Sequence, residues 1–470
     1  MFIVLSLFTF YLFLVGCVPG SFLRSKGGLL EHVGLTVAVG ILINYCLMLT
    51  GLTIPRVFIA GMVLASWAGW RLFRGGRAQA GPKGPALHGP GPARQGVGRV
   101  LLDPASVFAV CCIICVLVVY YFKILSEPVL QDDARFIWFF HARMIWADGA
   151  LRQSGGWNHP SIRFSNPDYP MLVPTIAAQL AYVKGYWNEF FPKGSLLVLL
   201  VPLTLWVFSF WRKSLSFILL VLTFFLSLGI LLWVGYMDGY LAMYAGAAVL
   251  LFGRYLSEGR DTDLYSAMCA LGIGASLKNE GLLFALCLVT SLLLIGPEYP
   301  AFRLRRFATR LRTDSLFANI LLLAIAPTVL WTIWKNAWGL HNDLARDPSA
   351  GFLRLWNRLF DGFTPLYLLN YMTMRATAGW MVIGLFAVTM IFSMHQGLKL
   401  HRGALVAATT SALYFAGLYV VYLSSPDYGL YALPFYLFTS ATRTMTTGSV
   451  ALLVGMFFLL SSLEVHEGSP

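Results

Sequence analysis

Residues 194–256 read GSLLVLLVPLTLWVFSFWRKSLSFILLVLTFFLSLGILLWVGYMDGYLAMYAGAAVLLFGRYL. This stretch holds three apolar runs, at 194–211, 216–234 and 239–256, separated only by Arg212–Lys213 and a short turn. Each run is long enough for a helix that crosses a hydrocarbon core about 30 Å thick. The stretch therefore predicts three consecutive transmembrane helices.

The same pattern extends along the chain in both directions. Of 470 residues, 58% are hydrophobic and only 12% are charged, whereas about a quarter of the residues in a soluble protein carry charge. No basic segment precedes the first apolar run, so we expect a transmembrane helix there and not a signal peptide. The fold class is an all-α polytopic membrane protein of about thirteen transmembrane helices. The predicted helices are roughly 1–19, 29–51, 55–73, 104–123, 194–211, 216–234, 239–256, 262–278, 281–297, 317–336, 376–394, 403–423 and 446–463.

The net charge of +13 comes from basic residues in short loops, as in the run RLRRFATRLR at 303–312. This distribution is typical of cytoplasmic loops in membrane proteins, and no soluble basic domain indicates nucleic-acid binding. It predicts an N-terminus outside and a cytoplasmic C-terminus. The Gly/Pro-rich segment 74–99 and the lack of organellar signals favour a bacterial inner (plasma) membrane. Termini on opposite sides require an odd number of membrane crossings, which holds only if Met171–Phe191 does not cross. We therefore expect this segment to lie against the outer face, as an interfacial helix of a long first outer loop at 125–193. The alternative is an ordinary short span.

Four regions are predicted along the chain. Residues 1–73 form a three-helix N-terminal extension, 74–103 a flexible basic cytoplasmic linker, 104–463 the main membrane domain, and 464–470 a short tail. All seven cysteines lie in apolar runs, so none remains for a disulfide in the outer loops. The stretch FLRLWNRLF in the outer loop 338–375 has the pattern of an amphipathic surface helix, which gates a site, contacts lipid headgroups or is simply solvated.

Ionisable residues at the outer ends of the spans are the candidates for chemistry. Asp132 and Asp133 open the longest outer loop, just before an aromatic-rich amphipathic helix. Asp238 is the only carboxylate between two strongly apolar spans; it is either functional or the N-cap of the following helix. Lys278 either serves a site, reaches the interface or pairs with Glu280. Arg443 is either functional or an ordinary arginine at a span edge.

Several motifs resemble those of bacterial GT-C type integral membrane glycosyltransferases, relatives of the dolichyl-phosphate-mannose-protein mannosyltransferase-like superfamily. DARFIWFFHARMIW at 133–146, followed by HPSIRFSNPDYPMLVP at 159–174, resembles their first outer loop. GYMDGYLAMYAGAAVLL resembles their second acidic loop, ASLKNEGLLFAL their lysine-containing turn, and YLFTSATRTM a C-terminal element. The resemblance covers roughly residues 105–460, and the first three spans are similar to an extension found in some relatives.

This resemblance implies an inverting transfer of a sugar from a polyprenyl-phosphate donor to an acceptor hydroxyl of a glycan, lipid or protein. The catalytic base falls on Asp133, with Asp132 second and Asp238 as a further acidic candidate. Lys278 and Arg443 are expected to bind the donor phosphate. The remaining candidates are His159, Asp168, Tyr169 and Glu280 for the acceptor or pocket, and Asp133, His141 and His159 for a divalent metal ion, which some relatives use and others do not.

Three other functions fit parts of the pattern. A lipid or solute transporter or flippase is expected to show internal repeats and polar, broken midplane helices, and the chain has no clear repeat. A polymerase or ligase of lipid-linked glycans also uses outer arginines, and the first outer loop holds several. A non-catalytic membrane assembly factor would tolerate replacement of every outer carboxylate. The acidic pair that opens the first outer loop favours the glycosyltransferase.

Overall fold

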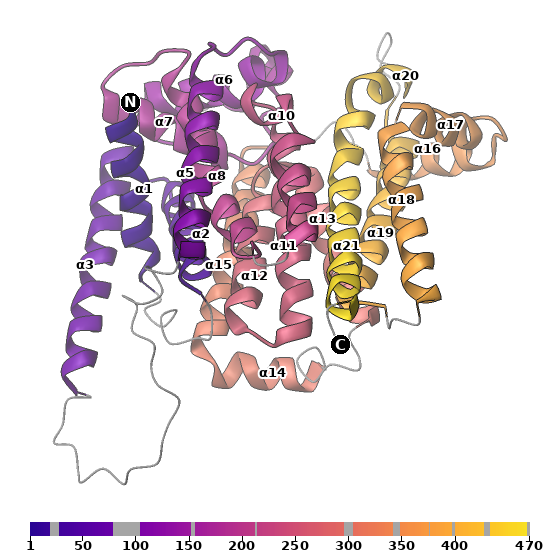
Figure 1. Ribbon diagram of the computed structural model, residues 1–470. Coiled ribbons are helices and arrows are strands. Elements are labelled where there is room, and N and C mark those ends of the chain that lie inside the picture. Colours follow the sequence, from indigo (N-terminus) through magenta and orange to yellow (C-terminus); the bar gives the residue numbers. More distant parts are fainter. Residues whose placement is uncertain are drawn as a thin grey trace, which may run out of the picture.

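The structure, a computed structural model, describes ten stretches of the chain: residues 1–18, 28–78, 104–151, 156–211, 214–295, 304–341, 348–375, 377–396, 400–426 and 433–467. These residues form helices and turns and contain no β-strand (Figure 1). The longer helices are α1 (Phe2–Gly16), α2 (Leu29–Leu49), α3 (Ile54–Ala78), α5 (Pro104–Leu125), α6 (Phe139–Asp148), α7 (Leu172–Lys184), α8 (Gly194–Phe208), α9 (Ser214–Val221), α11 (Met237–Glu258), α12 (Asp261–Ala275), α13 (Asn279–Ile295), α14 (Leu304–Thr313), α15 (Ser315–Ala337), α16 (Pro348–Phe360), α17 (Thr364–Arg375), α18 (Thr377–His395), α19 (Arg402–Ser424) and α21 (Thr442–Glu467).

Seven of the described helical segments are long and apolar enough to cross a membrane, and five shorter ones are apolar. The outward faces of the peripheral helices carry exposed large apolar side chains, for example Phe108 on α5, Leu322 on α15 and Val388 on α18. Water would make such a surface unstable, whereas lipid tails match it. The chain is therefore an all-α, multi-pass membrane protein, as its composition predicts.

Helix α11 lies at the centre of the bundle, where it packs against α12, α19 and α21. Its 22 residues span about 33 Å, and all of them from Met237 to Leu256 are buried. Each end of this helix carries a buried ionic cluster. Asp238 belongs to the cluster at the N-terminal end, and Arg254 belongs to the one at the C-terminal end.

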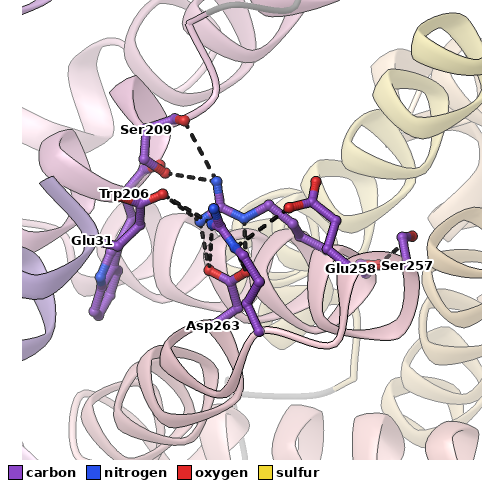
Figure 2. A network of polar contacts seen from close by, with 9 residues as sticks. Glu31, Trp206, Ser209, Ser257, Glu258 and Asp263 are labelled. Carbon is purple, nitrogen blue, oxygen red and sulfur yellow. Dashed lines mark hydrogen bonds and ion pairs between the residues drawn. The ribbon is translucent and has the colours of Figure 1, made fainter. Parts of the chain in front are cut away.

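The cluster at the C-terminal end of α11 is shown in Figure 2. Arg254 donates two hydrogen bonds to Asp263, from Nε over 2.9 Å and from Nη2 over 2.6 Å. Arg260 also binds Asp263, and its Nη2 lies 2.9 Å from Glu31 on α2. A buried charge is tolerated only when it is paired in this way. The network therefore joins α2, α11 and α12 at one end of the bundle.

Helix α2 belongs to the core and is not a peripheral extension. It packs against α8, α12 and α15, and most of its residues are buried. Asn44 on α2 and Gln179 on α7 exchange two amide hydrogen bonds, of 2.8 and 3.1 Å. Residues 1–73, predicted as a three-helix N-terminal extension, are therefore joined to the rest of the bundle through the buried helix α2.

Three predicted segments can be compared with the structure in detail. The apolar run at 216–234 is interrupted: a π-helical turn at Leu222–Leu226 and a bend at Gly229, which has a φ of +30°, separate α9 from the short α10 (Ile230–Trp233). Helix α3 continues through residues 74–78 of the predicted linker, whose remaining residues lie outside the described part of the chain. Helix α7 has only 13 residues, about 20 Å, too short to cross a membrane.

Two groups of helices lie crosswise at opposite ends of the bundle (Figure 1). Helix α14, which contains the basic run at 303–312 from Leu304 onward, lies at the lower end. Helices α16 and α17 lie at the upper end near α20 (Leu433–Tyr436), and α6 and α7 lie at the same end on the other side of the bundle. The predicted amphipathic helix in FLRLWNRLF is confirmed as α16. Its arginines bind carbonyls at the end of α19, because Arg358 Nη1 donates to the main-chain oxygen of Ser425 over 2.7 Å and Arg354 Nε to that of Ser424 over 3.1 Å. They therefore cap a helix and do not form a solvated face.

Candidate functional site

Three distant segments of the chain supply Asp133, Lys278 and Arg443 to the lining of one cavity of about 350 Å³, and a fourth supplies Asp238, which contacts both cations without lining the cavity. Asp133 precedes the π-helical turn η2 (Ala134–Trp138), and Asp238 lies in the first turn of α11. Lys278 lies in the turn between α12 and α13, and Arg443 lies in the first turn of α21. The sequence predicted these four residues as candidates, and the structure brings all of them together.

Ion pairs connect these side chains. Lys278 Nζ lies 2.9 Å from Asp238 Oδ1 and 3.1 Å from Glu280 Oε1. Arg443 Nη1 binds Asp133 and lies 3.7 Å from Asp238 Oδ2. Asp238 therefore contacts both cations, and Asp133 and Glu280 each contact one of them. Removing either cation would leave a carboxylate without its partner.

The alternatives left open for Asp238, Lys278 and Arg443 can now be judged. Asp238 is not the N-cap of α11, because Tyr236 occupies that position and makes no side-chain cap bond. Lys278 is 5% exposed, so it does not reach outward to the interface; it pairs with Glu280, as one alternative held, and with Asp238 as well. Arg443 is engaged on three sides: the guanidinium covers the ring of Tyr236 at 4.6 Å, and its Nε donates to the main-chain oxygen of Thr439 over 3.1 Å.

The local fold explains why Lys278 is held so deeply. Helix α12 ends at Ala275 and α13 begins at Asn279, so Lys278 lies in a turn of three residues. A Cβ atom on Gly281 would lie 2.1 Å from the main-chain oxygen of Gly274. Only glycine permits this close approach of the two helices. The turn is thereby fixed, and it directs Lys278 towards the start of α11.

The opposite wall of the cavity comes from the loop before α7. Asn279 Nδ2 donates to Asp168 Oδ2 over 2.9 Å, and Trp331 Nε1 donates to the main-chain oxygen of Asp168 over 3.1 Å. The ring of Tyr169 stacks on Trp138 at 5.4 Å. Burial raises the pKa of the Tyr169 hydroxyl, so this group stays protonated. Asp168 and Tyr169 are thus part of the site, as predicted.

Three predicted candidates lie elsewhere. Asp132 and His159 are exposed and do not line the cavity, and His159 Nδ1 accepts a hydrogen bond from the main-chain N–H of Ser161 over 3.3 Å. His141 is fully buried, with Nε2 3.0 Å from Ser165 Oγ. Burial lowers the pKa of His141 to about 3, although its bond with Ser165 raises it. Within the described residues no three His, Cys, Asp or Glu side chains are grouped to hold a metal ion, so Asp133, His141 and His159 do not form one site.

Several cavity residues were not predicted as candidates. Asn166 and Asn279 carry amides, and a wall of hydroxyls comes from α19 and from the segment that leads into α21. Tyr422 OH lies 2.9 Å from Ser440 Oγ and 3.0 Å from Thr444 Oγ1. A signal for them was present, since Asn279 lies in ASLKNEGLLFAL and the Ser and Thr residues lie in YLFTSATRTM.

The charges in the cavity do not balance. Three carboxylates, those of Asp133, Asp238 and Glu280, share the two cations Lys278 and Arg443. Glu280 Oε2 is buried and accepts no hydrogen bond from the described residues. A buried carboxylate oxygen without a hydrogen-bond partner favours the binding of a donor. The arrangement is therefore suited to binding an O–H group.

An apolar groove leads away from the site. It encloses about 550 Å³ between α12, α13 and α15 and is lined almost entirely by hydrocarbon, for example by Leu282, Val289 and Leu321. A small cavity of about 50 Å³ adjoins both spaces: Asn279 lines it and the site, and Ala275, Leu282 and Thr328 line it and the groove. A polar headgroup in the site could thus have its hydrocarbon chain in the groove.

The comparisons with known proteins give no match: no family model, no curated protein and no solved structure is detectably similar to this chain.

Proposed function

We propose that this protein is a membrane glycosyltransferase that moves a sugar from a polyprenyl-phosphate donor to an acceptor hydroxyl. The observation that carries the proposal is one cavity in which carboxylates and cations meet beside an apolar groove. A phosphate attached to a long hydrocarbon chain needs both environments, cations for its head and an apolar surface for its tail. The GT-C-like motifs of the sequence supply the same residues.

In the proposed reaction Asp133 accepts the proton of the acceptor hydroxyl. The acceptor oxygen then bonds to the anomeric carbon of the donor, and the bond between that carbon and the phosphate oxygen breaks. The electron pair of that bond leaves with the polyprenyl phosphate. Because the acceptor oxygen attacks from the face opposite to the leaving phosphate, the anomeric configuration is inverted. Asp133 lines the cavity and retains one oxygen that does not contact Arg443, which suits a general base.

Each of the two cations retains an N–H donor for the departing phosphate. Lys278 has three N–H donors and gives two of them to Asp238 and Glu280. Arg443 uses Nη1 for Asp133 and Nε for Thr439, and its Nη2 makes no bond with the described residues. One donor on each cation therefore remains for phosphate oxygens. Charge-assisted bonds of this kind stabilise a leaving group on which negative charge develops.

We propose further that the cavity faces the extracytoplasmic side of a bacterial inner membrane and that thirteen helices cross it. Helix α14, with its basic run, lies at the end of the bundle opposite to α6, α7 and α20, and basic segments favour the cytoplasm. The ends of the chain support an odd count, because α1 begins at one end of the bundle and α21 finishes at the other (Figure 1).

The proposal is tested by reconstituting the protein in lipid vesicles with decaprenyl-phosphate glucose and decaprenyl-phosphate mannose, together with sugar, lipid and peptide acceptors. Mass spectrometry measures the release of decaprenyl phosphate. Turnover of one donor supports the transferase. Movement of a fluorescent polyprenyl lipid between leaflets without any release would instead support the flippase, and joining of two lipid-linked glycans would support the polymerase or ligase.

A further inference from the structure

A second cavity of about 230 Å³ adjoins the site and differs from it in character. The two cavities share Asn166 and Asp168, which form the wall between them. Neither Lys278 nor Arg443 lines the second cavity. The rest of its lining includes Trp157, Asn158, Arg163, Pro167, Leu340 and His341.

The polar side chains of this second cavity are available to a ligand. Asn158, Arg163 and Asn166 make no side-chain hydrogen bond or ion pair with the described residues, and Asn158 and Arg163 are exposed. Amides, a guanidinium and the carboxylate of Asp168 offer donors and acceptors close together, which matches the neighbouring hydroxyls of a sugar ring. Trp157, Pro167 and Leu340 add an apolar wall for the C–H face of such a ring.

Asn166 is held in an unusual backbone conformation. Its φ is +47°, and among the described residues it is the only non-glycine residue with a positive φ. Asparagine tolerates this conformation at the end of a short helix, and Asn166 follows the helical turn Pro160–Ser165. This position at the helix end accounts for the positive φ of Asn166, but the side-chain amide makes no hydrogen bond with the described residues. The amide therefore stands at the boundary of both cavities, where it could contact a ligand in either one.

Asp168 is fixed in the same wall by Asn279 and Trp331, as described above. Asn279 is the neighbour of Lys278 in the chain, so the wall is connected directly to the cationic side of the site. A hydroxyl-bearing ligand in the second cavity would meet the reaction cavity across Asn166 and Asp168. An acceptor held in the second cavity would have to extend its hydroxyl past Asn166 and Asp168 to reach Asp133, which lines the first cavity.

We infer that the second cavity binds the acceptor and that the acceptor is a glycan, bound through one sugar residue. The inference rests on the proposed transferase function and adds to it the class of acceptor. A lipid alcohol is disfavoured because amide, guanidinium and carboxylate groups line this cavity, whereas the space lined almost entirely by hydrocarbon lies between α12, α13 and α15.

The first experiment measures binding and does not depend on turnover. Methyl glycosides of glucose, mannose, galactose and N-acetylglucosamine, and the matching disaccharides, are titrated into the full-length protein in detergent and followed by saturation-transfer NMR. The variants are Asn158→Ala and Asn166→Gly, since glycine keeps the positive φ and removes only the amide. Glu189→Ala, an exposed change in the same outer loop but outside both cavities, is the control.

We expect at least one glycoside to bind the wild type, with a Kd about tenfold higher in both cavity variants, the effect of losing one well-made hydrogen bond, and unchanged in the control. In the vesicle assay both variants raise the acceptor KM, and Asn158→Ala, whose side chain lines the second cavity only, leaves the donor KM unchanged. Absence of glycoside binding, or equal binding by all variants, would overturn the subsite.

The outcomes also separate this inference from the proposed function. Transfer to dodecanol or to a serine-containing peptide, with the glycosides inactive, would overturn the glycan acceptor and leave the transferase standing. Glycoside binding that depends on Asn158 and Asn166, without turnover of any donor, would remove the acceptor role and the transferase proposal together.

Discussion

At the scale of single residues, two adjacent aspartates occupy different environments. Asp133 binds Arg443 and lines the cavity, whereas Asp132 is exposed and does not line it. The sequence alone placed both at the start of the outer loop and could not separate them, because the contact depends on a residue 310 positions away. Their different positions provide a matched pair of substitutions.

We predict that Asp133→Asn lowers turnover of the polyprenyl-phosphate donor by about a hundredfold or more, the usual contribution of a general base. The amide keeps the shape of the side chain but cannot accept a proton. Asp132→Asn, which makes the same chemical change one residue away, should leave turnover close to that of the wild type. Initial rates in vesicles check both variants. Equal rates for Asp133→Asn and the wild type would remove Asp133 as the base.

His141 gives a prediction for stability against pH. Its pKa of about 3 in the folded protein is lower than the ordinary 6.5, so below pH 6.5 the unfolded chain binds a proton that the folded chain does not. Stability is therefore highest above pH 6.5 and falls as the pH drops towards 3, by at most about 1.4 kcal/mol per pH unit from this residue. Thermal unfolding in detergent between pH 7 and pH 5 should show a smaller decrease in His141→Gln. An identical decrease would show that His141 is not the cause.

At the scale of the helices, the length of each apolar run predicted where a helix lies but not how the helices break or pack. Each predicted span contains a helix because a run of apolar residues must satisfy its own backbone in a membrane. The break at Gly229 was missed, because Ser227–Gly229 lies inside an otherwise apolar run. The embedding of α2 was missed too, because hydropathy does not reveal which helices are central. Glu31 and Asn44, two polar residues in an apolar helix, were the available signal.

We predict that the amides of Asn44 and Gln179 stabilise the protein as a pair. Replacing either residue by leucine leaves a buried amide without its partner, which costs about 1–3 kcal/mol, while the double replacement costs less than the two single ones added together. Thermal unfolding of the three variants in detergent provides the comparison. Additive effects would show that the two side chains act independently.

At the scale of the whole molecule, the sequence predicted the members of the site but not their pairing. Asp133, Asp238, Lys278 and Arg443 were grouped because their loops share one predicted side of the membrane. Which cation meets which carboxylate depends on how η2, α11, α13 and α21 pack, and no residue pattern along the chain contains that information. The second cavity was out of reach for the same reason, since it combines the loop before α7 with the segment after α15.

The orientation of the molecule gives the last prediction. If the site faces outwards, Glu189→Cys in the loop after α7 should react with a membrane-impermeant maleimide in intact spheroplasts. Thr313→Cys at the end of α14 should react only after the membrane is permeabilised. Both positions are exposed, and the wild type measures the background from its seven native cysteines. The reverse pattern would place the cavity in the cytoplasm, where the polyprenyl-phosphate donor would have to be presented from the inner leaflet. Labelling of both positions in intact spheroplasts would contradict the odd number of spans predicted between Glu189 and Thr313, because the two residues would then lie on one side of the membrane.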